Sequence, residues 1–98
     1  MATVSLINEL IKAADRIERL PFQEKARLLR KAAETIEDLR AQLILSDCAA
    51  DDDAFGDIVF ELQGLARVIS NANTKEVAER MRESVVIIAR LQRFVERR

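Results

Sequence analysis

Apolar side chains recur three or four positions apart through most of this 98-residue chain. Between residues 21 and 45, a seven-residue repeat places four large side chains on one helical face: Phe22, Leu29, Ile36 and Leu43. Such spacing is typical of an amphipathic α-helix with a coiled-coil seam. Only two glycines and one proline are available to interrupt helices. The sequence therefore predicts an all-α protein.

The periodicity predicts one domain, residues 1–98, with a helix in each quarter of the chain. The expected helices cover approximately residues 6–20, 21–45, 54–71 and 75–96. Ser5 and Thr74 are the expected N-caps of the first and last helices. Three successive aspartates mark residues 46–53 as the clearest loop. The expected architecture is a four-helix bundle built from two helical hairpins.

The last predicted helix carries apolar side chains around its whole circumference. Four of them are consecutive: Val85, Val86, Ile87 and Ile88. A helix that is apolar all round needs cover on every side, which one small subunit can hardly supply for its final helix. We therefore expect a homodimer or higher oligomer, with an interface formed by Val85, Val86, Ile87, Ile88 and Leu91.

Composition excludes several classes of chemistry. The chain has no histidine and a single cysteine, Cys48. Neither an intrachain disulfide nor a Cys/His zinc site can form, and Ser-His-Asp or Cys-His catalysis is ruled out. Apolar runs such as residues 85–89 are too short to span a bilayer. The expected setting is cytoplasmic, without a membrane partner.

One carboxylate constellation indicates an enzymatic alternative. Glu34 and Glu37 lie three apart in the second predicted helix, and Asp57 lies near the start of the third. Carboxylates from adjacent antiparallel helices can hold Mg²⁺, which prefers oxygen ligands. A metal in that position could activate water against a nucleotide diphosphate linkage.

Residues 31–67 resemble the all-α nucleotide pyrophosphohydrolases of the MazG type. The likeness lies in Glu34-Thr35-Ile36-Glu37, a gap of sixteen residues, and Ala54-Phe55-Gly56-Asp57-Ile58-Val59-Phe60. That family implies a Glu-x-x-Glu pair followed by Glu-x-x-Asp, and Ala54 replaces the second glutamate of the pattern. The resemblance implies a Mg²⁺-dependent pyrophosphohydrolase-like protein, active or degenerate, with Glu34, Glu37 and Asp57 as metal ligands.

Charge is distributed unevenly, although the net charge is only −1. The C-terminal helix presents Arg90, Arg93 and Arg97 at helical spacing, and they suit an acidic surface. The predicted loop supplies Asp51, Asp52 and Asp53 for a basic surface. No aromatic series accompanies the arginines, so a protein partner is favoured over nucleic acid.

We interpret the chain as a non-enzymatic helical interaction protein without a cofactor, acting as a regulator or inhibitor of a protein partner. Segments such as KAADRIERL, residues 12–20, look similar in composition to small helical proteins of bacteria, phages and mobile elements. That likeness implies a phage-type inhibitor of a host system, including an anti-defence role.

Overall fold

A computed structural model of the chain describes the backbone of residues 2–45 and 52–97 and the side chains of residues 3–42 and 58–96. Within these ranges the helices are α1 (Ala2–Asp15), α2 (Phe22–Leu45), α3 (Asp52–Arg67) and α4 (Thr74–Arg97), with a 3₁₀ turn, η1 (Ile17–Arg19), after α1. The described residues form no β-strand, so the all-α prediction is confirmed. No helix among them is long and apolar enough to cross a membrane.

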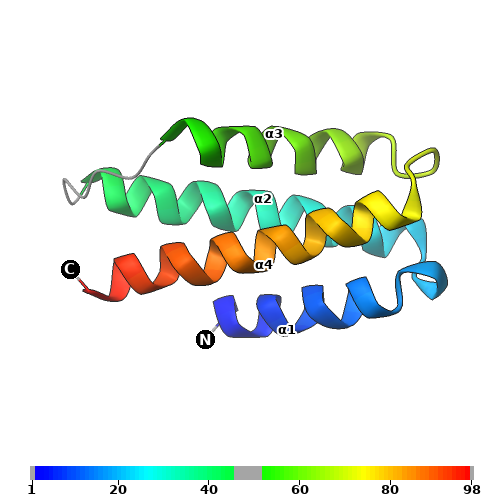
Figure 1. Ribbon diagram of the computed structural model, residues 1–98, viewed down its shortest axis with the longest axis horizontal. Coiled ribbons are helices and arrows are strands. Elements are labelled where there is room, and N and C mark those ends of the chain that lie inside the picture. The colour runs from blue at the N-terminus through cyan, green and yellow to red at the C-terminus, as the bar shows by residue number, and fades with distance from the viewer. Residues whose placement is uncertain (1, 46–51, 98) are drawn as a thin grey trace.

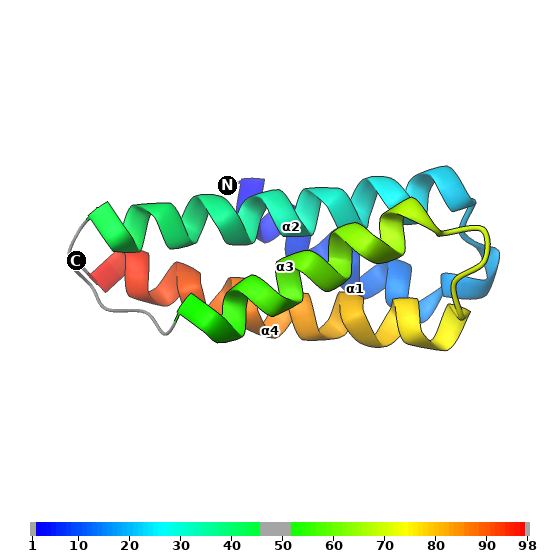
Figure 2. The same ribbon diagram turned by 90° about the horizontal axis from the view of Figure 1, so that it is seen from above.

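The helices lie side by side and alternate in direction along the chain, so that α2 runs parallel to α4 (Figures 1 and 2). The closest packing joins α2 to α3, α2 to α4, and α1 to α4. The sequence neighbours α1 and α2, like α3 and α4, pack against each other less extensively. Chain order predicts two hairpins, whereas α1 packs mainly on α4 and α3 mainly on α2.

Small side chains allow the central helices to approach closely. Ala32 and Ala33 of α2 are fully buried at 0% exposure. Interaxial distance depends on the side chains at the contact, and alanine keeps that distance short. For the last helix, alternating four- and three-residue spacing predicts a seam of Val77, Met81, Ser84, Ile88, Leu91 and Val95. The first five are buried, and Val95 is partly buried against the core. The buried Ser84 hydroxyl donates to the Met81 carbonyl oxygen at 2.6 Å, which satisfies its hydrogen-bonding requirement.

Helical spacing also predicts that Val4 and Ile11 belong to the apolar face of the first helix, but they and Phe22 lie on the surface. Val4 and Ile11 of α1 and Phe22 of α2 are 57%, 43% and 53% exposed. Phe22 lies over the ammonium group of Lys25, which is 5.2 Å from the ring centroid. The Lys25 side chain is itself buried, so this cation–π contact gives it an electrostatically favourable neighbour.

The chain between α1 and α2 differs from the predicted continuous helix over residues 6–20. α1 begins at Ala2, so Ser5 lies within it and is not its N-cap. The helix ends at Asp15, and the backbone then forms η1 before Leu20 becomes extended, with φ −81° and ψ 132°. The residue before a proline is disfavoured in the α region, so Pro21 accounts for the break at Leu20.

The turn between α3 and α4 is longer than the sequence pattern predicts. α3 ends at Arg67, not near residue 71. α4 begins at Thr74, and its N-cap is Asn73, not the predicted Thr74. The Asn73 side-chain oxygen accepts a hydrogen bond from the Lys75 N–H at 2.9 Å, and its carbonyl accepts one from the Val77 N–H at 3.0 Å. Both bonds are those of an N-cap residue.

Substitution Asn73→Ala is expected to lower the free energy of unfolding by about 1 kcal/mol, because it removes the side-chain acceptor for an unpaired helix N–H. Urea unfolding followed by far-UV circular dichroism measures the change. Thr74→Ala is the matched control, since no cap hydrogen bond of α4 uses the Thr74 side chain. A larger loss at Thr74 than at Asn73 would contradict the assigned cap.

Candidate functional site

The C-terminal turns of α4 extend past the start of α1 (Figure 1). α1 has 14 residues and α4 has 24, which correspond to helix lengths of about 21 Å and about 36 Å. Asp15, at the end of α1, pairs with Arg82 of α4 at 3.5 Å. α1 runs antiparallel to α4 and begins short of the C-terminal turns of α4, which therefore lack cover from α1 (Figure 1).

Two of the three predicted arginines lie on an exposed face of this segment. Arg90 and Arg93 are exposed and, by helical spacing, share their face with Val86, which is 57% exposed. Phe94, 46% exposed, lies beside them. We call Val86, Arg90, Arg93 and Phe94 the α4 outer face. Arg97 is part of α4, but its side chain lies outside the described residues.

The charges of Arg90 and Arg93 are not neutralised by the described part of the subunit. Neither side chain makes an ion pair or a hydrogen bond there. Glu96 is three residues from Arg93, but one of its oxygens accepts a hydrogen bond from Gln92 Nε2 at 3.3 Å. The α4 outer face therefore combines two unpaired guanidinium groups with two exposed apolar side chains.

Other arginines are engaged in ion pairs between helices. Arg80 of α4 pairs with Glu61 of α3 at 2.9 Å and with Glu83 on its own helix. The hydrogen bond with Glu83 raises the pKa of the Arg80 guanidinium above its ordinary value. Such pairs join α3 to α4, in addition to the pair of Asp15 with Arg82 that joins α1 to α4.

Arg27 of α2 makes a comparable set of contacts. Its guanidinium pairs with Glu24 on the same helix and lies 4.0 Å from the carboxylate of Glu9 on α1. The hydrogen bond from Arg27 holds the pKa of the Glu24 carboxyl below its ordinary value of 4.5. These groups are exposed to solvent, so their contribution to stability is small.

The predicted acidic surface cannot be located. Asp51 lies outside the described residues, and Asp52 and Asp53 are described only as backbone in the first turn of α3. The segment containing Cys48 also lies outside them. The acidic surface therefore stays a prediction from sequence.

Two residues of the oligomer interface predicted on α4, Ile88 and Leu91, lie inside the subunit. Ile88 and Leu91 are 0% exposed within the single subunit, and Val85 and Ile87 pack against the same core. Only Val86 of this set is largely exposed. We call the apolar run from Val85 to Ile88 the girdle. It is covered within the subunit because α1 and α2 both pack on α4. Ile88 and Leu91 are core residues, not surface contacts.

The carboxylates proposed as metal ligands are only partly located. Glu34 and Glu37 are both exposed on α2, while the Asp57 side chain lies outside the described residues. Among the residues that the structure describes, no group of three metal-ligating side chains comes together. The convergence of Glu34, Glu37 and Asp57 therefore stays a prediction.

An open groove of about 330 Å³ lies between α2 and α3 and was not expected from sequence. It is lined by Arg30 and Glu34 of α2 and by Gln63 and Arg67 of α3. Glu34 therefore shares the groove with two cationic side chains, Arg30 and Arg67, and with the amide of Gln63. Sequence periodicity placed these residues outside the core, but it gave no register between α2 and α3 that would bring them together.

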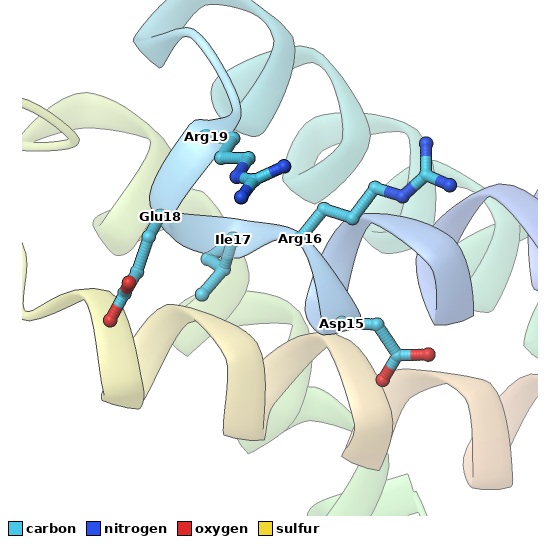
Figure 3. Close-up of a pocket in the computed structure, with 5 residues that line it drawn as sticks. All are labelled: Asp15, Arg16, Ile17, Glu18 and Arg19. Carbon is cyan, nitrogen blue, oxygen red and sulfur yellow. The ribbon is translucent and has the colours of Figure 1, made fainter.

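A second hollow, of about 390 Å³, lies where the chain turns from α1 into α2. Its lining comes from one continuous segment, Asp15 to Arg19 (Figure 3). The Asp15 and Glu18 side chains point to the side of α4, whereas Arg16 and Arg19 extend the other way (Figure 3). Because its charged groups diverge, this hollow lacks a convergent set of groups for a ligand.

Comparisons of the chain with protein-family models, with curated proteins and with solved structures gave no match.

Proposed function

We propose that this protein is a non-enzymatic interaction protein that binds an acidic surface of a protein partner through the α4 outer face. The observation that carries the proposal is a pair of exposed guanidinium groups, Arg90 and Arg93, that have no partner among the described residues and lie beside the exposed Val86 and Phe94. Arginine and aromatic side chains are enriched at protein interfaces, where guanidinium groups bind carboxylates in a bidentate manner.

A binding role also agrees with the polar surface of the molecule. The two hollows described above are open and lined mainly by charged side chains, whereas ligand sites of enzymes are usually enclosed and mostly apolar. Binding to a partner without chemistry is the ordinary mode of a regulator or inhibitor. We extend the proposal to such a role, with the acidic partner as the regulated protein.

Self-association forms the second part of the proposal. A second copy would contact Val86 and Phe94, since Ile88 and Leu91 are already inside the subunit. Two copies aligned in parallel would bring Arg90 and Arg93 close to their equivalents, and like charges repel. An antiparallel pairing of Val86 on Phe94 is centred on position 90 and also brings the two Arg90 side chains together, so self-association and binding of the acidic partner compete for this face.

Charge reversal at Arg90→Glu and Arg93→Glu is expected to reduce capture of the partner at least about tenfold, because two attractive contacts become repulsive. Co-purification from the source organism, quantified by mass spectrometry, measures the change. The matched control is Arg16→Glu with Arg19→Glu, an equal change of charge at another exposed pair. Equal capture by both variants would remove the α4 outer face from the interaction.

A further inference from the structure

The groove between α2 and α3 brings two unpaired cations together. Arg30 of α2 and Arg67 of α3 both line it, and both are exposed. Neither makes an ion pair or a hydrogen bond within the part of the chain that the structure describes. Glu34 follows Arg30 by four residues, a spacing that commonly gives an intrahelical ion pair, yet these two side chains are not paired. The groove therefore keeps its positive charges available.

The two guanidinium groups are independent of the ion pairs that hold the helices together. Those pairs use Arg27, Arg80 and Arg82. Arg30 and Arg67 gain nothing from each other, because like charges that share one groove repel. An anion placed between them would replace that repulsion with two attractive contacts. Gln63, on the same groove, adds an amide that can donate a further hydrogen bond.

The outer face of α3, next to the groove residues Gln63 and Arg67, has two features that packing within the subunit does not explain. Phe60 is 76% exposed, the highest value among the large hydrophobic side chains that the structure describes. Gly64 lies in the interior of α3, where glycine weakens a helix, and an added Cβ would meet nothing within 4 Å. Phe60, Gly64 and Arg67 follow at four- and three-residue spacing, so they share one outer face of α3.

We propose that the groove between α2 and α3 is a second binding site, which takes an acidic segment of a protein partner. A carboxylate of the segment lies between Arg30 and Arg67 and accepts from Gln63. An apolar side chain next to that carboxylate packs on Phe60, and the absence of a side chain at Gly64 lets the backbone of the segment approach α3.

The chemistry of the groove favours a peptide carboxylate over a free phosphate. The site is open and its charged side chains are exposed, so it does not enclose a small molecule. The exposed Phe60 adds apolar contact area that a phosphate ion cannot use.

The probe is a capped peptide of six glutamates around one central phenylalanine, titrated into the ¹⁵N-labelled full chain. We expect saturable NMR shifts at the Arg30 and Arg67 side-chain N–H groups and at the amides of residues 60–67. Arg30→Gln with Arg67→Gln should weaken this binding at least about tenfold, because both charge-assisted contacts are lost. The matched control, Arg16→Gln with Arg19→Gln, should bind as the parent chain does.

Two further titrations complete the test. Arg90→Gln with Arg93→Gln should keep the groove shifts, so failure of the α4 outer face and failure of the groove are distinguished. Phe60→Ala should weaken peptide binding without changing the fold. Unchanged affinity in the Arg30 and Arg67 double variant would overturn the proposal. So would inorganic phosphate that saturates the groove at lower concentration than the peptide, which would identify a small-anion site.

Discussion

Substitution Ile88→Ala is expected to lower the free energy of unfolding by about 2–5 kcal/mol. Ile88 is 0% exposed in the middle of α4, and its neighbours in the seam, Ser84 and Leu91, are equally buried. Deleting buried methylene and methyl groups loses their transfer free energy and leaves a cavity, since surrounding helices relax only partly. Urea unfolding followed by far-UV circular dichroism measures the loss.

The matched control lies two residues away. Val86→Ala removes apolar carbons from the same helix, but Val86 is 57% exposed, and the expected change is within about 0.5 kcal/mol. Sedimentation of the Val86→Asp variant measures whether the oligomeric state depends on this residue. If a second copy packs on the α4 outer face, the Val86→Asp variant dissociates and sediments with a lower molecular mass than the parent chain. A large stability loss at Val86 with little at Ile88 would mean that the girdle faces another chain, contrary to the structure.

Substitution Ala32→Leu is expected to destabilise the fold by about 1–3 kcal/mol, although leucine is a good helix former. Ala32 is 0% exposed on α2, the helix that packs closely on both α3 and α4. Three added carbons have no space at that contact, so side chains must leave their preferred rotamers or the helices must separate. The same unfolding measurement reports the cost.

Ala41→Leu provides the control for helix propensity. Ala41 lies on the same helix but is exposed, so the added side chain extends into solvent. The expected change is within about 0.5 kcal/mol. If Ala32→Leu were as harmless as Ala41→Leu, α2 would not pack closely through its alanines, and the central position of α2 would need revision.

Much of the core followed from local periodicity. The three- and four-residue spacing identified the seam of α4 from Val77 to Val95, and every predicted seam residue is buried except Val95, which is partly buried. The pattern succeeds because successive turns of a helix bring those positions onto one face. It failed at Phe22, which fits the repeat of α2 but is 53% exposed in its first turn.

The two candidate sites also differ in whether helical spacing alone could locate them. Arg90 and Arg93 could be placed on one face from their spacing alone, because both belong to one helix. The groove could not be anticipated, because Arg30 belongs to α2 and Arg67 is the last residue of α3. Their proximity depends on the register between α2 and α3, which side-chain packing decides and which helical periodicity does not encode.

The spacing of apolar residues therefore determined that this chain is helical, where most of its helices lie and which face of each is buried. Tertiary packing decided which helices are partners: α1 covers α4, α3 covers α2, and the girdle of Val85 to Ile88 becomes mostly interior. The physical reason is that periodicity is a local property of 3.6 residues per turn, whereas cover for an apolar face comes from whichever helix fits it.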